Sequence, residues 1–300
     1  MPARSGTPTA SRPTLPLPLV SGRGKLRAMI DLDLSGRRAI VTGASLGIGA
    51  AVVRLLADHG ATVSFCARGE AAVAELAGYR PAGSAAAGTR ASGAVRGYVA
   101  DMGDATSTER FLDAVDADTG PADILVNNVG ASPSRNFLYM RDDDWEQLHQ
   151  LNLMSAVRCT RRCLPAMRAQ QWGRVIMIAT SGAVYPNAAL IDYAATKAAM
   201  IATAKALAGK YGGDGVLVNT ILPGLIHTSM WDRAAGEIAA ASGGATSAAD
   251  VIERNGRGVP VGRYGTPEEV AAAVVFLASN AASYVNGVAL AVDGGSGGHV

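Results

Sequence analysis

Short runs rich in β-branched residues alternate with longer Ala-rich stretches along most of this 300-residue chain, starting at Arg38. The alternation is typical of βαβ units, in which helices connect the parallel strands of one sheet and cover its faces. Strands are predicted at 39–42, 62–67, 95–100, 124–127, 174–179, 215–221 and 288–292. Helices are predicted at 48–59, 70–77, 107–119, 143–167, 192–211 and 267–279. The sequence therefore predicts an α/β fold with a doubly wound, seven-stranded parallel sheet flanked by helices on both faces.

Two longer segments interrupt this alternation. Residues 78–97, rich in Ala, Gly and Ser, are predicted to form a surface loop. Residues 228–260 are predicted to form a larger excursion with helical pieces of its own.

The N-terminal segment differs in composition from the rest of the chain. Residues 1–30 carry five basic side chains, no acid and five of the thirteen prolines, whereas the net charge of the whole chain is only +2. The other 270 residues therefore carry −3, which argues against nucleic-acid binding, because a basic footprint would have to lie on the folded part. We predict that residues 1–28 are a disordered, basic, Pro-rich leader and that residues 29–300 form a single domain.

Composition excludes several further classes of protein. Hydrophobic residues make up 49% of the chain and charged residues 17%, which predicts a globular protein with a large core. Three cysteines without a CxxC pair and four scattered histidines predict neither a disulfide framework nor a metal site. No apolar run approaches the roughly 18 residues that a membrane span requires. We expect a cytoplasmic protein with no metal, no membrane and no nucleic acid as a partner.

A glycine-rich loop follows the first predicted strand. Its sequence, residues 42–49, is TGASLGIG, and a predicted helix continues from it. Gly43, Gly47 and Gly49 permit a tight turn, close approach of the backbone to a pyrophosphate and close packing of the helix on the strand. The helix N-terminus adds free N–H groups and a partial positive charge. A glycine-rich loop alone also fits an ordinary turn, but its place between strand and helix predicts a nucleotide site.

A second motif, YxxxK, is formed by Tyr193 and Lys197. Residues four apart on a helix lie one turn from each other on the same face. A neighbouring ammonium favours the phenolate of a tyrosine, whose pKa is ordinarily about 10, so the pair suits proton transfer near neutral pH. Such pairs also occur on exposed helices, but the position of this one after the fifth predicted strand favours a functional pair.

The segments TGxxxGIG and YxxxK, in this order, resemble the short-chain dehydrogenase/reductase family, and among its members the reductases of 3-oxoacyl thioesters such as 3-oxoacyl-(acyl-carrier-protein) reductase. The resemblance covers about nine-tenths of the chain, including the closing segments 263–269 and 286–295. It implies a Rossmann-like fold with a substrate loop at about 228–260. It also implies a homo-oligomer, a tetramer or a dimer, built through the helices that contain Asn152 and Tyr193.

The resemblance further implies a set of dinucleotide contacts. Asp101 matches the acid that reads the adenine amino group, and Asn128 lies in the segment NNVG, which resembles the family's NNAG. The backbone near Ile226 and the hydroxyl of Thr228 match the positions that hold the carboxamide. The implied cofactor-binding residues are Gly43, Ser45, Leu46, Gly47, Ile48, Gly49, Arg68, Asp101, Met102, Asn128, Gly130, Tyr193, Lys197, Pro223, Gly224, Ile226 and Thr228.

The end of the second predicted strand bears on the choice between NADP(H) and NAD(H). NAD-dependent relatives place an acid there, whereas this chain has Ala67 and Arg68. A guanidinium pairs with a 2′-phosphate, which a carboxylate would repel. NADP(H) is therefore favoured, and NAD(H) stays possible because Leu46 stands where many NADP(H) relatives carry a second basic residue.

The same resemblance implies the catalytic residues. Tyr193 is the acid/base, and Lys197 lowers its pKa and holds the nicotinamide ribose. The family's serine lies thirteen residues before the tyrosine, where this chain has Thr180, with Ser181 next to it. Either hydroxyl can bind the substrate oxygen, and register favours Thr180. Asn152 matches the asparagine that holds a water on a proton relay to the lysine.

The expected function is an oxidoreductase that transfers hydride between NADP(H) and a small-molecule carbonyl or secondary alcohol. Two alternatives remain open at this point. One is an NAD(H)-dependent alcohol dehydrogenase of the same family, and the other is a non-catalytic dinucleotide-binding redox sensor or scaffold.

Overall fold

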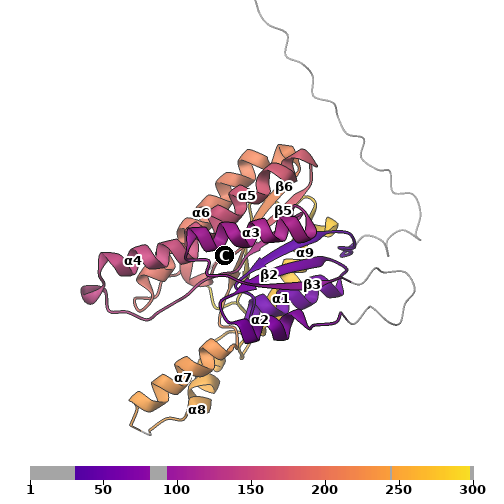
Figure 1. Ribbon diagram of the computed structural model, residues 1–300. Helices are drawn as coiled ribbons and strands as arrows, with labels where there is room; N and C mark the ends of the chain where they lie inside the picture. The colour runs from indigo at the N-terminus through magenta and orange to yellow at the C-terminus, as the bar shows by residue number, and fades with distance from the viewer. Residues whose placement is uncertain (1–30, 82–92, 244, 298–300) are drawn as a thin grey trace, which may run out of the picture.

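Seven parallel strands form one sheet in the computed structural model, which describes residues 31–81, 93–243 and 245–297 (Figure 1). The strand order is β3-β2-β1-β4-β5-β6-β7. The strands are β1 (Arg38–Thr42), β2 (Thr62–Ala67), β3 (Val95–Val99), β4 (Ile124–Asn127), β5 (Gly173–Ile178), β6 (Val216–Pro223) and β7 (Ala289–Val292). This is the predicted doubly wound, Rossmann-like sheet. Each strand begins and ends within two residues of its predicted bounds.

The strand order reverses between β1 and β4. The chain first builds the sheet outward from β1 through β2 to β3, and then returns to the other side of β1 to add β4. At such a reversal the loops that follow the two central strands diverge and leave a crevice at their carboxyl ends. The glycine loop follows β1 and the segment NNVG ends β4, so both meet at this position.

Helices cover both faces of the sheet (Figure 1). One face packs against α1 (Gly47–Asp58), α2 (Glu70–Ala77) and α9 (Pro267–Ala278), and the other against α3 (Ala105–Thr119), α5 (Ser155–Ala169) and α6 (Ile191–Tyr211). Val41 and Val126 belong to the first apolar cluster, while their neighbours Ile40 and Leu125 belong to the second. Successive side chains of a strand point to opposite faces, so each strand contributes to both cores.

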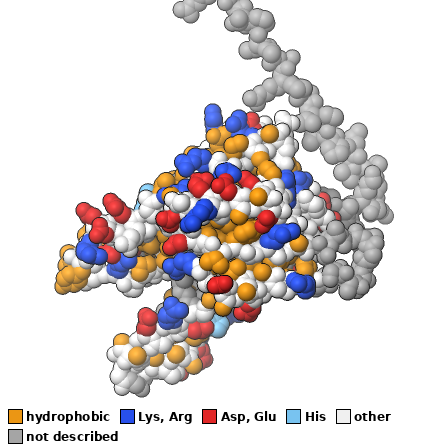
Figure 2. All heavy atoms as spheres, in the orientation of Figure 1, with side chains coloured by type: hydrophobic (Ala, Val, Ile, Leu, Met, Phe, Trp, Pro, Cys, Tyr) orange, Lys and Arg blue, Asp and Glu red, His pale blue; other side chains and the backbone are white. Residues whose placement is uncertain are grey.

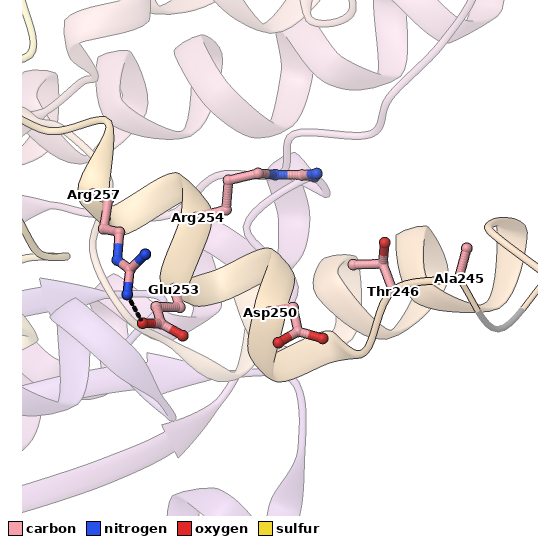
Figure 3. Close-up of a pocket in the computed structure, with 6 residues that line it drawn as sticks. All are labelled: Ala245, Thr246, Asp250, Glu253, Arg254 and Arg257. Carbon is pink, nitrogen blue, oxygen red and sulfur yellow. Dashed lines mark hydrogen bonds and ion pairs between the residues drawn. The ribbon is translucent and has the colours of Figure 1, made fainter.

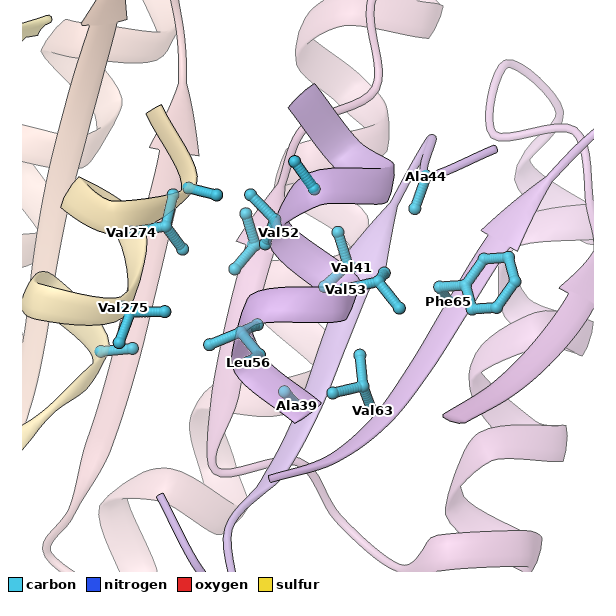
Figure 4. Close-up of a cluster of buried hydrophobic side chains, with 14 of the residues drawn as sticks. Ala39, Val41, Ala44, Val52, Val53, Leu56, Val63, Phe65, Val274 and Val275 are labelled. Carbon is cyan, nitrogen blue, oxygen red and sulfur yellow. The ribbon is translucent and has the colours of Figure 1, made fainter. Parts of the chain in front are cut away.

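The first core lies between β1, β2, α1 and α9. Val52 and Leu56 of α1 face Val274 and Val275 of α9 in Figure 4, and all four are buried. Phe65 of β2 is fully buried in the same cluster. This contact fixes α1 in position and therefore also the glycine loop that precedes it.

The predicted helix 143–167 consists of three consecutive pieces. They are α4 (Asp142–His149), a π-helical turn, η4 (Gln150–Met154), and α5 (Ser155–Ala169). A π-helical turn holds an additional residue and is frequent at functional sites. The three acids at the start of α4 occupy its first turn, as the helix dipole favours.

The segment 228–260 contains two helices, α7 (Ser229–Ala241) and α8 (Ala248–Arg257), in agreement with the helical pieces predicted there. They pack on each other and project from the body of the protein (Figure 1). The remaining short helices are η3 (Phe137–Tyr139), η5 (Ser181–Ala183), η6 (Gly212–Asp214) and η7 (Asn280–Ala282). No helix in the described part of the chain has the length and apolar character to cross a membrane.

Two sequence predictions fall on other parts of the chain. The leader 1–28 and its boundary at residue 29 lie outside the described residues, as do residues 82–92 of the predicted loop 78–97. The last residues of that loop are in β3, which begins at Val95. The single-domain prediction for residues 29–300 stays a prediction.

Candidate active site

The glycine loop is held against the end of β4 by a set of hydrogen bonds. The side-chain amide of Asn128 donates to the carbonyl oxygens of Thr42 and Gly43, at 3.0 and 2.8 Å. In return, the buried hydroxyl of Thr42 accepts from the backbone N–H groups of Asn128 and Val129, at 3.1 and 3.2 Å. A Cβ atom on Gly49 would lie 2.6 Å from the Asn128 side-chain nitrogen, so glycine is needed for this contact.

The N-terminus of α1 is open toward the same crevice. Its N-cap residue, Leu46, makes no side-chain hydrogen bond to the first turn and is 63% exposed. Gly47 has a φ of +55°, and a Cβ there would lie 3.1 Å from Cγ2 of Thr228. The structure thus brings Thr228, which follows β6, against the glycine loop. Free N–H groups, glycine backbone and a helix dipole fit the pyrophosphate of a dinucleotide.

The predicted adenosine side lies at the ends of β2 and β3. Arg68 is exposed, and its guanidinium makes no ion pair or hydrogen bond with the residues that the structure describes. Asp101 is also exposed and accepts from the N–H of Gly103 at 2.9 Å, whereas Met102 is buried. A guanidinium without a partner among the described residues, and no acid at Ala67, fit a phosphate on the adenosine ribose.

Tyr193 lies in the first turn of α6 and contacts Thr180, which follows β5. Burial raises the pKa of the Tyr193 phenol above its ordinary value, whereas the sequence predicted that Lys197 lowers it, and the Thr180 hydroxyl opposes the rise only in part. The Thr180 hydroxyl also accepts from the backbone N–H of Gly182 at 3.2 Å and so caps η5. Ser181 is the first residue of η5, and no hydrogen bond links its hydroxyl to Tyr193.

Lys197 is buried one turn further along α6. Its ammonium donates to the carbonyl oxygen of Ile178 at 2.9 Å and lies 3.4 Å from that of Val129. No carboxylate of the described chain pairs with it, and burial lowers its pKa to about 8. A Cβ on Gly130 would lie 3.1 Å from the Lys197 nitrogen and 3.4 Å from Oδ1 of Asn152. The lysine and the asparagine therefore meet beside this glycine.

Asn152 occupies the π-helical turn and is fully buried. Its side chain accepts from the N–H of Ala131 at 2.9 Å and donates to the carbonyl of the same residue at 3.0 Å. It also donates to the hydroxyl of Thr196 at 3.1 Å. Asn152 thus fastens the segment after β4 to α6.

The carboxyl end of β6 supplies the last predicted contacts. Ile226 is buried and pairs with Gly265, while Pro223 ends β6 beside Val292. Gly224 packs closely on the backbone of Asp293. At these positions the chain offers mainly backbone to a ligand.

A hollow of about 390 Å³ lies outside this crevice, on α8 and the turn before it. Figure 3 shows Arg257 bound to Glu253 along α8, with Asp250 nearer to the turn. None of its residues is a predicted catalytic or cofactor-binding residue, although all lie in the predicted substrate loop 228–260; it is lined by Ala245, Thr246, Asp250, Glu253, Arg254 and Arg257. On the face drawn in Figure 2, basic and acidic side chains are interspersed rather than gathered by sign.

Several residues of this region are absent from the sequence prediction. Thr42 and Thr196 complete the hydrogen bonds described above. Arg135 and Asp192 form an ion pair at 2.7 Å beside Tyr193. Only Asp192 had a weak signal in the sequence, as an acid in the first turn of a predicted helix. The roles of the other three depend on partners that are distant in sequence.

Comparison with known proteins identifies the family. A family model described as enoyl-(acyl carrier protein) reductase matches residues 43–297. The 3-oxoacyl-(acyl-carrier-protein) reductase FabG of Vibrio harveyi is 35% identical over 266 residues, which cover 88% of this chain and 98% of that protein. The uncharacterized oxidoreductase YvrD of Bacillus subtilis is 35% identical over 272 residues, 89% of this chain and 98% of that protein.

Solved structures agree with this result. L-Sorbose reductase from Gluconobacter frateurii, in complex with NADPH and L-sorbose, superposes with a TM-score of 0.81 at 32% identity, covering 90% of this chain and all of that one. A variant of actinorhodin polyketide ketoreductase with NADPH gives a TM-score of 0.78 at 30% identity, covering 88% and 98%. The chain belongs to the short-chain dehydrogenase/reductase family and is an NAD(P)-dependent oxidoreductase.

Proposed function

We propose that this protein reduces a small-molecule carbonyl to a secondary alcohol with NADPH, or catalyses the reverse oxidation with NADP⁺. The observation that carries the proposal is the Thr180 hydroxyl beside the half-buried Tyr193 phenol, one helical turn from the buried Lys197. An acid/base, a second hydroxyl and a cation together suit proton transfer to an oxygen.

The choice of NADP(H) is supported by the guanidinium of Arg68, which has no partner in the described part of the chain, and by the absence of an acid at Ala67. Two structural relatives, L-sorbose reductase and the polyketide ketoreductase, are complexes with NADPH. Leu46 offers no charge to a 2′-phosphate, so NAD(H) is the competing cofactor.

The bound nicotinamide would supply or accept hydride at the substrate carbon. The chain's own residues would manage the oxygen and its proton. Tyr193 donates its phenolic proton to the carbonyl oxygen, and Thr180 donates a hydrogen bond to that oxygen. Because burial keeps the pKa of Tyr193 above its ordinary value, the phenol is protonated at neutral pH, the form required for carbonyl reduction.

Two other residues would hold this arrangement. Lys197 would place its ammonium near the cofactor ribose, and Asn152 fixes the segment 130–136 against α6 through Ala131. A water held by Asn152 on the way to Lys197 is part of the proposal.

A parallel screen tests the function. Ketones and aldehydes are offered with NADPH and with NADH, and secondary alcohols with NADP⁺ and NAD⁺. We expect turnover with at least one carbonyl and a preference for NADPH. Preference for NADH would favour an NAD(H)-dependent alcohol dehydrogenase. Tight NADPH binding without turnover of any substrate would favour a redox sensor.

A further inference from the structure

A buried ion pair adjoins the residue proposed to move the proton. Asp192 directly precedes Tyr193, and its side chain is completely buried. Its Oδ2 atom accepts a hydrogen bond from Nη1 of Arg135 at 2.7 Å. Its Oδ1 atom accepts from the backbone N–H of Tyr193 at 2.8 Å. The carboxylate therefore joins an arginine from a distant segment to the backbone of the tyrosine itself.

The carboxylate of Asp192 satisfies a backbone N–H group in the first turn of α6. The N-cap residue of α6, Leu190, makes no side-chain hydrogen bond, so the first turn lacks the usual partner for its free N–H groups. Asp192 supplies that partner from within the turn, where a negative charge also suits the helix dipole. A carboxylate without solvent contact needs a compensating cation, and Arg135 is that cation.

Arg135 lies in the segment 130–136, which follows β4. Its backbone N–H donates to the carbonyl of Ala189 at 3.4 Å, and its Nη2 atom lies 3.6 Å from Asp144 of α4. The other end of this segment is fastened to α6 through Asn152 and Thr196, as described above. The segment is thus tied to α6 at both ends, and the Arg135–Asp192 pair forms the second tie.

We propose that Arg135 and Asp192 are positioning residues that fix the first turn of α6, and with it the Tyr193 phenol, against the segment 130–136. The inference rests on the proposed function, because it assigns a catalytic purpose to the position of Tyr193. Both carboxylate oxygens of Asp192 are engaged by hydrogen bonds, so the residue acts through Tyr193 rather than on the substrate. Cofactor affinity depends on the glycine loop and Arg68, which the pair does not contact.

Kinetics of matched variants test this role. Arg135→Gln and Asp192→Asn should each lower kcat by about tenfold to a hundredfold, because a small displacement of an acid/base group is costly. The KM for NADPH should not change. The double variant should lose no more than the worse single variant, because either change already breaks the tie. Arg141→Gln is the control: this exposed arginine lies 3.7 Å from Asp144, and its ion pair does not involve Asp192.

Amide hydrogen exchange of residues 189–196, measured without cofactor or substrate, gives a readout independent of activity. Exchange should be faster in both pair variants and unchanged in Arg141→Gln. If Arg135→Gln fails to fold, the same kinetics and exchange are measured on the double variant, which removes both charges together and leaves neither one buried alone. The proposal would be overturned by any of three results. Amide exchange could be unchanged in the folded variants of Arg135 and Asp192, the losses of kcat in the double variant could be additive, or Arg141→Gln could lose as much kcat as they do. Faster exchange in a protein whose wild type reduces no carbonyl would support the tie and overturn the proposed function.

Discussion

Thr180 and Ser181 differ in what their hydroxyls contact, although they are neighbours in sequence. Thr180 reaches the Tyr193 phenol and also caps η5, whereas Ser181 begins η5. A hydroxyl beside the proton donor is well placed to bind the oxygen that receives the proton. The choice of Thr180, which register in the sequence favours, therefore stays our prediction.

Replacing each hydroxyl separately checks this choice. Thr180→Ala should lower kcat about a hundredfold, as removal of a transition-state hydrogen bond commonly does. Ser181→Ala should have a small effect and serves as the matched control. Steady-state kinetics on the best substrate of the screen give both values. Equal effects of the two changes would contradict the assignment.

Lys197 is a charge buried without a carboxylate partner in the described chain, and this makes stability depend on pH. Its pKa is about 8 in the folded protein against 10.5 in the unfolded chain. Between these values the unfolded state binds more protons, so stability rises with pH, by up to about 3 kcal/mol from this group. Below pH 8 the lysine is charged in both states and its burial is fully unfavourable.

Lys197→Met should therefore be more stable than the wild type at pH 7, with a difference that shrinks as pH rises from 8 to 10. Urea unfolding of both proteins without cofactor, at each pH, measures this. Burial raises the pKa of Cys66, Cys159 and Cys163, which lowers stability as the pH rises above about 9. These thiols are common to both proteins and cancel in the comparison. A stability difference between Lys197→Met and the wild type that does not change with pH would contradict the lowered pKa of Lys197.

At the scale of elements, the glycine loop depends on how closely α1 approaches the end of β4. The amide of Asn128 bonds to two carbonyl oxygens of the loop, and Gly49 leaves the space in which this amide lies. The open N-terminus of α1 is thus positioned by a side chain from a different strand.

Gly49→Ala should weaken NADPH binding, because the new Cβ would lie 2.6 Å from the Asn128 side-chain nitrogen and from the carbonyl oxygen of Gly43. We expect a loss of affinity of about tenfold or more, equivalent to a hydrogen bond. Gly209→Ala in α6, where a Cβ meets nothing within 4 Å, is the control. It should keep full affinity and raise stability by about 0.5–1 kcal/mol. Fluorescence titration and thermal unfolding provide the two readouts, and equal affinities of the two variants would argue against this role of Gly49.

The elements that sequence predicted well are those with a local signal. The strands from β1 to β7 are short β-branched runs, and Gly43 and Gly47, with φ values of +67° and +55°, mark a turn that other residues rarely adopt. The π-helical turn was missed, because one additional residue within the predicted helix 143–167 scarcely alters its apolar period. The pair of Arg135 and Asp192 was also missed. The two residues are 57 positions apart, and the sequence does not indicate which acidic and basic side chains form an ion pair.

At the scale of the whole molecule, the sheet brings segments from distant parts of the chain to one edge. The loop after β1, the NNVG segment after β4, Thr180 after β5 and Thr228 after β6 all lie at carboxyl ends of parallel strands. Because all the strands run in the same direction, these loops meet at the same edge of the sheet. Order of motifs in the sequence was therefore sufficient to predict that they would form one site.

The cofactor preference is a property of this assembled edge. Replacing Ala67 and Arg68 by Asp and Ser should lower NADPH affinity about tenfold or more, through loss of the guanidinium and repulsion by the new carboxylate. NADH affinity should hold or improve. Arg110→Ser, which removes an exposed arginine on α3, is the control for the loss of one surface guanidinium. Unchanged relative affinities for the two cofactors in the double variant would refute the role of Arg68.

The central claim, that Tyr193 transfers the proton in an NADPH-dependent carbonyl reduction, is tested most directly by NADPH consumption with wild-type protein and Tyr193→Phe. The substitution removes one oxygen from a half-buried ring and leaves the cofactor contacts of the glycine loop intact. We predict that kcat falls about a hundredfold or more while the variant still binds NADPH. Turnover by Tyr193→Phe at the wild-type rate would contradict the account.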